Sequence, residues 1–552
     1  MDSSNYKNKF PAAFPRLTSD QMEAVSQVAE CKTYHNGEVL LKAGDTGFRF
    51  HVIQKGEIEI IDRSDGKPIT LLVHEAFEFT GDIANLAGRS SNVDAIAHGT
   101  VEVYEVCADE LKMIISAQPE LSDIILKAFI ARSKALEESD FTGFRLIGEE
   151  SSKDTFRIRD FLSKNSVIFT WIDLQSDDDV GKLMSRFHVT ENDFPIVAYG
   201  NEWILRNPTN IALAEKIGIR RALKEEIYDL AIVGGGPAGL AAAVYGASEG
   251  LKTVILERMA PGGQAGASSK IENYLGFPTG LSGAELAERA TMQAEKFGAQ
   301  LSIPSVVLRL HFDNNLNVLE LESGEKITSR SLLIASGAEY KKLPVENLEK
   351  YEGRGVYYAA TKMEATMCGQ SSIAIVGGGN SAGQAAVFLS SFVEKIYLII
   401  RGESLSLTMS QYLEHRIRES PGIELLNDTE IEKISGDEML ESISIVNNKT
   451  KEKKEIKLSA IFSFIGAFPC TGWLPPEIET DEKGFVKTGP HVHECEHWTL
   501  KRQPFLLETS RPGVFAAGDV RSNSIKRVAS AVGEGSMVVQ FVHEFIRDLV
   551  TE

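Results

Sequence analysis

Cysteine is scarce in this chain of 552 residues. The five cysteines are scattered, and no two of them are separated by only two residues: Cys31, Cys107, Cys368, Cys470 and Cys495. A disulfide framework, a zinc ribbon and a local dithiol site all need cysteines that are close together. The sequence therefore predicts none of these three, and we expect no metal site.

Long apolar runs and clustered positive charge are also missing. No apolar segment approaches the roughly 18 to 20 residues that span a bilayer. The N-terminus, Met1 to Pro15, lacks the apolar core and cleavage site of a secretory signal. The formal net charge is −20, which disfavours nucleic acid and acidic membranes, because phosphate contacts need clustered Lys and Arg. We therefore expect a cytoplasmic protein that binds neither nucleic acid nor membranes.

The length exceeds what one hydrophobic core can organise, so several domains are expected. Residues 12 to 140 contain short alternating segments punctuated by glycines. Phe50 to Ile60 alternates around Lys55-Gly56, which predicts a hairpin, and Val101 to Val106 predicts another strand. Asp109 to Leu136 has apolar residues at helical spacing. Strands followed by a helix predict a β jelly roll with a helical tail.

A second small unit follows, over residues 146 to 220. Its predicted elements are a helix at Arg157 to Ser163, a strand at Val167 to Asp173, a helix at Val180 to Phe187, a strand at Phe194 to Val197, a turn at Gly200-Asn201 and a helix at Thr209 to Ile217. This order resembles the thioredoxin and glutaredoxin fold, in which an X-Pro bond before the third strand is usually cis. That fold carries its redox cysteines at the first helix, which corresponds here to Gly148 to Asp160 and contains none. A spacer or docking domain is therefore favoured over a redox role.

From about Tyr228 the pattern changes to strand, glycine turn and helix, which is typical of a parallel α/β sheet. The apolar strand Asp229 to Val233 leads directly into Gly234-Gly235-Gly236-Pro237-Ala238-Gly239, and Leu240 to Ser248 is helical. In such a turn Gly234 permits the bend, Gly236 lets backbone approach a pyrophosphate, and Gly239 allows close helix–strand packing. The next strand ends at Glu257, where an acid can accept hydrogen bonds from a ribose hydroxyl.

The same pattern recurs at Ser372 to Val376, followed by Gly377-Gly378-Gly379-Asn380-Ser381-Ala382. The position equivalent to Glu257 is Ile400, and Arg401 follows it. Loss of the acid and gain of a cation favours a 2′-phosphate, and therefore NADPH over NADH. Two alternatives stay open, since Arg401 can also be a solvated residue at a strand end and NADH can also be the donor.

A third signature lies near the end of the chain. The apolar strand in Gly513 to Ala517 delivers Gly518-Asp519 to a turn, and a helix is predicted from Ala529 to Phe545. In flavoproteins with two nucleotide sites, such an aspartate meets the ribitol and pyrophosphate region of FAD. The helix would point its N-terminus at the flavin ring.

Residues ~225 to 552 resemble the low-molecular-weight thioredoxin reductases. The segments that carry the resemblance are Gly262 to Gln264, Ile271 to Pro278, Gln293 to Ala299, Ile334 to Ala338 and Gly513 to Asp519. The resemblance implies an FAD domain split around an inserted NAD(P)H domain, and a homodimer. The implied FAD contacts are Gly234, Gly236, Pro237, Ala238, Gly239, Glu257, Gly263, Gln264, Asn273, Gly337, Gly518, Asp519, Arg527 and Val528. The implied NADPH contacts are Gly377, Gly379, Asn380, Ser381, Ala382 and Arg401.

The chain departs from that family where its redox-active Cys-Ala-Thr-Cys would lie. The matching stretch is Val356 to Lys362, with Ala359 and Lys362 at the two cysteine positions. Without a thiolate there is no nucleophile to reduce a disulfide. Cys368 is interpreted as a structural residue. Lys362 is interpreted as solvated, with stabilisation of a reduced flavin as the alternative, so no catalytic residue is assigned. The family's His-Arg-Arg motif is reduced to Ile400-Arg401-Gly402.

The N-terminal region resembles a cyclic-nucleotide-binding domain. Phe79 to Ile83 and Ser90 to Ala95 match its phosphate-binding segment, but the family's phosphate-binding arginine falls on Ser91. Arg89 could substitute for it if the loop shifts. A regulatory or docking domain without a cyclic nucleotide is favoured, and cyclic-nucleotide binding is the alternative, because a cyclic phosphate without an arginine loses a charge-assisted contact.

The predicted fold class is therefore multidomain α/β and β: a jelly roll, a small thioredoxin-like domain and two Rossmann-like domains. The predicted boundaries are 1–145 for the jelly roll, 146–222 for the thioredoxin-like domain, 223–342 together with 465–552 for the FAD domain, and 343–464 for the NAD(P)H domain. The whole order resembles a bacterial group of fused reductases. The leading hypothesis is hydride transfer from NADPH to FAD and on to an unknown small-molecule or protein acceptor. Three alternatives stay open: a thioredoxin reductase that uses thiols elsewhere, a ferredoxin or flavodoxin reductase, and a non-enzymatic redox or nucleotide sensor.

Overall fold

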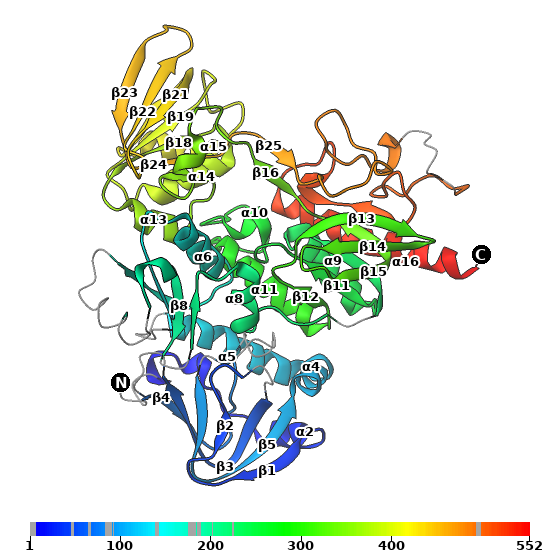
Figure 1. Cartoon of the computed structure of the whole chain (residues 1–552). Helices are drawn as coiled ribbons and strands as arrows, with labels where there is room; N and C mark the ends of the chain where they lie inside the picture. Colours follow the sequence, from blue (N-terminus) through cyan, green and yellow to red (C-terminus); the bar gives the residue numbers. More distant parts are fainter. Residues whose placement is uncertain are drawn as a thin grey trace. The chain divides into compact units, whose positions relative to one another are not determined.

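The computed structural model describes residues 7–45, 49–63, 68–82, 91, 93–137, 143–174, 184, 189–200, 203–223, 226–492, 498 and 500–551 (Figure 1). By their internal contacts the residues form two compact units. The first comprises 1–149, 167–224 and 292–304, and the second comprises 150–166, 225–291 and 305–552.

The first unit begins with a β domain whose strands run in the order β1-β5-β3-β4, with β2 paired to β5. Its elements are η1 (Pro11–Ala13), α2 (Ser19–Ser26), β1 (Glu30–Tyr34), β2 (Val39–Leu41), β3 (Arg49–Asp62), β4 (Ile69–His74), β5 (Asp94–Cys107), α4 (Ala108–Ala117) and α5 (Pro119–Glu137). The rings of Phe50, Phe79 and Phe129 are fully buried and pack against one another. A β domain closed by helices confirms the predicted N-terminal fold.

Two details of that prediction were wrong. Phe50 to Ile60 is not a hairpin, because β3 runs straight through Gly56, which has a positive φ of 90° and lies at an irregularity in the pairing with β5. A Cβ on Gly56 would lie 2.5 Å from the carbonyl oxygen of Thr100, so this glycine marks a bulge with a close backbone approach. The single helix predicted from Asp109 to Leu136 is two helices, because Pro119 begins the second one.

We expect the β domain to lose stability as the pH falls from about 6.5 to about 4. Burial lowers the pKa of His74 to about 4, although its contact with Glu78 acts in the opposite direction. A depressed pKa means that the unfolded chain binds a proton first, which costs up to about 3 kcal/mol of stability when the pH has fallen below both values. Hydrogen exchange of β4 peptides, measured by mass spectrometry, should show this loss.

His74→Gln should remove most of that acid sensitivity. The exposed His98, which pairs with Glu57 on the same domain, provides the control, since His98→Gln should leave it in place. An equal loss of protection in the His74→Gln variant would show that another group is responsible.

A second sheet of the first unit has the order β7-β6-β8-β9, in which β6 and β7 are parallel and the other pairs are antiparallel. Its elements are β6 (Phe144–Gly148), β7 (Phe169–Asp173), η2 (Glu191–Asp193), β8 (Ile196–Tyr199), β9 (Trp203–Arg206) and α8 (Asn210–Lys216). The Phe194–Pro195 bond before β8 is cis, as predicted. Assignment to the thioredoxin fold stays a prediction. Of the helix predicted at 180–187, only Met184 lies within the described residues. Asn201 of the predicted turn also lies outside them.

The sequence patterns missed β6, and the predicted boundary at 145/146 falls inside it. The strand is short and fully buried, so it has no alternation that would mark it. The other predicted boundaries stay predictions. Residues 292–304, which contain the end of α11 and the strand β12 (Gln300–Ser302), group with the first unit.

The second unit contains a sheet with the order β11-β10-β15-β14-β13, and β26 pairs with β15. Its elements are β10 (Ile227–Val233), α9 (Pro237–Ser248), β11 (Thr253–Leu256), α10 (Gly263–Gly266), α11 (Gly283–Lys296), β13 (Val307–Asp313), β14 (Leu316–Leu321), β15 (Lys326–Ile334), β26 (Val514–Ala516), η4 (Gly518–Val520) and α16 (Val528–Thr551). The pairs of β10 with β11, β10 with β15, and β15 with β26 are parallel. This is the first predicted Rossmann-like domain.

The second Rossmann-like domain has the parallel order β17-β24-β18-β19-β20 and a β21-β22-β23 meander, and a short β16-β25 pair adjoins it. Its elements are β16 (Ala338–Tyr340), α12 (Leu348–Tyr351), β17 (Val356–Tyr357), α13 (Lys362–Cys368), β18 (Ser372–Val376), α14 (Asn380–Leu389), β19 (Lys395–Ile399), α15 (Gln411–Glu419), β20 (Ile423–Leu426), β21 (Thr429–Ser435), β22 (Ser442–Asn447), β23 (Lys453–Lys457), β24 (Ala460–Ser463) and β25 (Ala467–Pro469), and η3 (Gly489–His491) lies further along. Both predicted nucleotide-binding folds are confirmed.

The helix α6 (Lys153–Lys164) belongs to the second unit by its contacts. Phe156 packs beside Tyr357 of β17, with ring centroids 5.7 Å apart, and joins the apolar core around α13 and β18. At the other end of the helix, Asn165 donates a hydrogen bond to the carbonyl oxygen of Met259 at 3.0 Å. This single helix therefore contacts both Rossmann-like domains.

Candidate dinucleotide sites

The first glycine turn has the geometry that a pyrophosphate site needs. Gly234 has a φ of 110°, and a Cβ on it would lie 2.2 Å from the carbonyl oxygen of Ala335. A Cβ on Gly239 would lie 1.9 Å from the carbonyl oxygen of Gly234. Gly236, which precedes Pro237 at the start of α9, has no atom within 4 Å of its Cβ position. The fold itself requires Gly234 and Gly239, whereas Gly236 leaves space in front of a helix N-terminus, where phosphate binds well.

Glu257 closes one side of this turn. It follows β11 and is 8 % exposed. Its Oε2 accepts a hydrogen bond from the backbone N–H of Gly235 at 2.6 Å, and its Oε1 accepts one from Met259 at 2.9 Å. Burial raises the pKa of this carboxyl group. The two backbone bonds hold the carboxylate beside the first glycine turn, and its contact with a ribose hydroxyl stays a prediction.

The third signature lies beside the first, although nearly 300 residues separate them. Ala516 of β26 pairs with Ile334 of β15, and a Cβ on Gly518 would lie 3.2 Å from the Cβ of Ala238. The next residue is Asp519, and burial raises the pKa of its carboxyl group. The helices α9 and α16 touch closely, since a Cβ on Gly535 would lie 2.1 Å from the carbonyl oxygen of Ala238.

One residue of this region was missed from the sequence. Glu534 accepts a hydrogen bond from the backbone N–H of Gly518 at 2.7 Å and pairs with Arg521. It therefore fixes the turn that carries Asp519. The available signal was a single acid, Glu534, between two glycines near the start of an apolar helix.

The other predicted FAD contacts fall into two groups. A Cβ on Gly263 would lie 3.1 Å from the Cα of Gly236, and Gln264 donates a hydrogen bond to the carbonyl oxygen of Ala338, next to Gly337. These residues therefore gather at the first glycine turn. The rest lie in exposed or partly exposed positions, and their place at the cofactor stays a prediction: Asn273 on the loop 271–281, Arg527 before α16 and Val528 at its start.

The second glycine turn repeats the same geometry. Gly377 has a φ of 144°, and a Cβ on it would lie 2.8 Å from the carbonyl oxygen of Phe464, whereas the Cβ position of Gly379 has no atom within 4 Å. Asn380 accepts hydrogen bonds from the backbone and the hydroxyl group of Ser410 at 2.7 and 2.8 Å. Ala382 is fully buried. The open space again lies in front of a helix, α14.

Two further residues flank this second turn. Ser381 shares a hydrogen bond with the Tyr340 hydroxyl, and burial, the larger effect, raises the pKa of Tyr340. Arg401 follows β19 with a side chain that is 79 % exposed, and its Nε lies 3.9 Å from Glu430. Since its guanidinium group is mostly open to solvent, Arg401 can meet a ligand at this edge of the sheet.

The stretch at the expected dithiol position forms the start of α13. Thr361 caps this helix together with the buried Glu364, and Lys362 is its first, exposed residue. Burial raises the pKa of Glu364. Burial, followed by Glu364, also raises the pKa of the Cys368 thiol to about 12. Cys368 is therefore a protonated, buried thiol at neutral pH, in agreement with its interpretation as a structural residue.

Cys470, a half-buried thiol of the same unit, is also protonated. Burial and the neighbouring Glu339 raise its pKa to about 11. Its backbone N–H donates to the carbonyl oxygen of Gly337. A thiolate is the reactive form of cysteine, so neither Cys368 nor Cys470 is an activated nucleophile.

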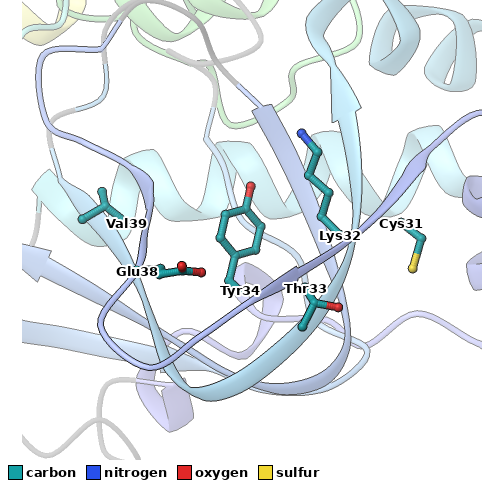
Figure 2. A pocket seen from close by; sticks show the side chains of 6 residues that line it. All are labelled: Cys31, Lys32, Thr33, Tyr34, Glu38 and Val39. Atoms are coloured by element: carbon teal, nitrogen blue, oxygen red, sulfur yellow. The ribbon is translucent and has the colours of Figure 1, made fainter.

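A separate hollow of about 680 Å³ lies on the N-terminal β domain (Figure 2). It is lined by Cys31, Lys32, Thr33, Tyr34, Glu38 and Val39. Lys32 and Tyr34 point to one side of β1 and reach the carboxylate of Glu105, each at 2.7 Å. The hollow belongs to the first unit, whereas both glycine turns belong to the second.

The predicted phosphate-binding segment of this β domain is described only in part. Residues 83–90 and 92, which include Arg89, lie outside the described residues. Ser91 is buried, and its hydroxyl group donates to the carbonyl oxygen of Val93 at 2.7 Å. The buried carboxylate of Asp94 accepts hydrogen bonds from Ala43 and from Arg63. Ser91 therefore serves the local turn.

The comparisons with known proteins agree with these folds. Residues 228–535, more than half of the chain, match the model of the pyridine nucleotide-disulphide oxidoreductases. The chain belongs to this family. Residues 31–118 match the cyclic nucleotide-binding domain, which confirms the resemblance seen in the N-terminal sequence.

The relatives of this family member include thioredoxin reductases. The enzyme of Treponema pallidum is 32% identical over 326 residues, which cover 59% of this chain and 99% of the relative. That of Bacillus subtilis is 31% identical over 59% of this chain and 97% of its own. Among solved structures, Lactococcus lactis thioredoxin reductase in the FR conformation matches with a TM-score of 0.52 and 29% identity, covering 58% of this chain and 99% of its own.

This oxidoreductase is thus of the thioredoxin reductase-like type, and the cofactors of that family are FAD and NADPH. The residues present fit both groups, because Gly236 and Gly379 each leave an open space before a helix that a side chain would fill. The predicted cofactors and enzyme class are confirmed. Across the described residues, every helix is too short or too polar to cross a membrane.

Proposed function

We propose that this oxidoreductase passes electrons from NADPH to FAD and then to an acceptor outside the chain, without a redox-active dithiol. The proposal is carried by two observations taken together. Each of the two glycine turns leaves open space in front of a helix, and Ala359 and Lys362 stand at the expected cysteine positions. The two turns support binding of a donor and a flavin. The missing thiols remove the usual route from flavin to disulfide.

The residues of the first site have separate binding tasks. The N-terminus of α9 would bind the FAD pyrophosphate through backbone N–H groups, and Glu257 would accept a hydrogen bond from a ribose hydroxyl. Asp519 would accept one from the ribitol chain, with its turn fixed by Glu534. Bound FAD would supply the two-electron chemistry, since the protein's part in such reactions is binding, orientation and electrostatics.

The second site would hold the donor in the same way. Gly379 leaves room for the pyrophosphate, and the N-terminus of α14 faces it. Asn380 is held by Ser410, and Ser381 by Tyr340, which orders the first turn of α14 around the phosphates. Lys362 is exposed and caps nothing, so it is available at the start of α13 to contact an acceptor.

Anaerobic titration of the FAD-loaded protein with NADPH, and separately with NADH, tests this function. We expect one equivalent of NADPH to bleach the flavin absorbance, because one hydride carries the two electrons that FAD accepts. An aromatic disulfide reagent added to the reduced protein should be consumed far more slowly than by a thioredoxin reductase with its dithiol. Rapid release of the reagent's thiol, or an unbleached flavin, would contradict the proposal.

We propose that the N-terminal β domain and the small four-stranded domain act as regulatory or docking domains of the reductase. We also propose that the protein is a homodimer. Ser91 supports the regulatory or docking role over cyclic-nucleotide binding, because it stands where the resembled family has a phosphate-binding arginine and its hydroxyl group donates to the carbonyl oxygen of Val93. Isothermal titration with cyclic AMP should therefore give no binding heat, and a measurable affinity would favour the sensor alternative.

A further inference from the structure

The two glycine turns of this chain can be compared directly, since both follow a parallel strand. In the first, a Cβ on Gly235 would lie 3.2 Å from the Glu257 side chain. In the second, a Cβ on Gly378 would lie 3.6 Å from the Cγ2 atom of Ile400. Ile400 therefore occupies the place of the ribose-binding acid. The residues just after Ile400 lie where the 2′ position of a bound adenosine would be.

A hairpin from another part of the domain reaches this place. Asp428 donates its backbone N–H to the carbonyl oxygen of Gly402 at 2.9 Å, and Asn448 donates to the carbonyl oxygen of Asp428 at 2.6 Å. These bonds bring the turn between β22 and β23 beside the loop that follows Arg401. At that turn, Lys449 lies 3.3 Å from Glu403 and 3.1 Å from Asp428.

The charges around Arg401 are mostly negative. Glu430 lies 3.9 Å from Arg401, and Glu403 is two residues away in sequence. Together with Asp428, these two acids make three carboxylates in this region, where the cations are Arg401 and Lys449. A 2′-phosphate adds about −1.5 to −2 charges, so its binding depends on how fully these carboxylates are neutralised.

We propose that Lys449 is a specificity-determining residue that admits a 2′-phosphate beside Arg401 by neutralising Glu403 and Asp428. The inference rests on the proposed function, in that the second turn is the donor site. Lys449 acts through the two carboxylates, so it is a positioning residue, and Arg401 is the group that faces the phosphate. A ribose with a free 2′-hydroxyl carries no charge there and is insensitive to Lys449.

The test compares two small probes on the FAD-loaded protein: adenosine 2′,5′-bisphosphate, which carries the 2′-phosphate, and AMP, which does not. Isothermal titration should show that Lys449→Ala weakens binding of the bisphosphate by roughly two- to fivefold, the size of one exposed charge interaction. The AMP affinity should stay unchanged. The bisphosphate effect should shrink in high salt, since these side chains are exposed.

Two further variants sharpen the result. Lys453 lies on the same hairpin and pairs with Glu432, so Lys453→Ala is the matched control and should change neither affinity. Adding Glu403→Gln to Lys449→Ala should restore part of the bisphosphate affinity, because one of the two unpaired carboxylates is then gone. Equal weakening of both probes, no weakening of either, or equal affinity of the wild-type protein for the two probes would overturn the inference.

Failure of this inference is distinct from failure of the proposed function. If NADPH bleaches the flavin but Lys449→Ala leaves the bisphosphate affinity unchanged, the electron transfer stands and the role of Lys449 is wrong. If the bisphosphate pattern holds while no nucleotide bleaches the flavin, the donor site stands and the electron transfer is wrong.

Discussion

A Gly236→Ala variant is expected to fold normally and to be purified without flavin. The residue has a φ of −73°, which any L-residue adopts, and its Cβ position has no protein atom within 4 Å. The methyl group would instead occupy the space through which the pyrophosphate approaches the backbone. Overpacking of this kind costs about 1 to 3 kcal/mol, which corresponds to FAD binding that is weaker by roughly five- to 150-fold.

The matched substitution in the other turn, Gly379→Ala, should weaken the binding of NADPH and leave the binding of FAD unchanged. That variant should keep its yellow flavin but require far more NADPH to bleach it. Flavin content after gel filtration and the NADPH titration measure the two effects. Gly472→Ala, at another position with nothing within 4 Å, is the control and should change neither. A Gly236→Ala protein that retains a full complement of FAD would show that the pyrophosphate lies elsewhere.

The largest loss of stability is expected from Arg502→Leu. Glu508 is completely buried and accepts two hydrogen bonds from Arg502, at 2.6 and 3.0 Å. It also accepts the backbone N–H groups of Phe505 and Gly513. Removing the guanidinium group leaves a buried carboxylate without its countercharge, which costs about 3 to 5 kcal/mol. Thermal unfolding should occur at a clearly lower temperature.

This ion pair also bears on the flavin site, because Gly513 leads into β26 and from there to Asp519. We therefore expect Arg502→Leu to release FAD at a lower temperature than the wild-type protein. The exposed Arg309 provides a control, since Arg309→Leu should change stability by less than about 0.5 kcal/mol. A double variant that also carries Glu508→Leu should regain part of the loss. No difference between Arg502→Leu and Arg309→Leu would show that the buried pair contributes little.

The two glycine turns, 234–239 and 377–382, could be predicted because the glycine spacing that marks each of them lies within a short stretch of sequence. The glycine spacing, the approach of Gly239 to Gly234 and the distance along the chain to Glu257 all lie within one strand–turn–helix–strand stretch. The approaches of Gly234 to Ala335 and of Gly377 to Phe464 join distant segments and were not visible in the sequence. The signature at Asp519 was also visible in the sequence. The family resemblance implied a split FAD domain, but the sequence did not reveal the parallel pairing of β26 with β15 that brings Gly518 beside Ala238.

The errors came from contacts between distant segments. Gly56 was interpreted as a turn, because nothing in the sequence reveals that the backbone of Thr100 comes within 2.5 Å of its Cβ position. Glu534 was missed because its role depends on the N–H of Gly518, which belongs to a different element. The loop contacts of Lys449 were invisible for the same reason, since its partners lie 21 and 46 residues earlier.

The position of α6 decides where the reductase part of this chain can be cut. A shortened protein that starts at residue 225 would contain both Rossmann-like domains and both glycine turns, so its sequence alone would suggest a complete reductase. It would lack Phe156, so the ring of Tyr357 and the core behind it would face water, and the carbonyl oxygen of Met259 would lose its partner Asn165. Exposed apolar surface of this kind promotes aggregation. A soluble minimal reductase therefore has to carry residues 150–166 as well, supplied within the chain or as a separate peptide.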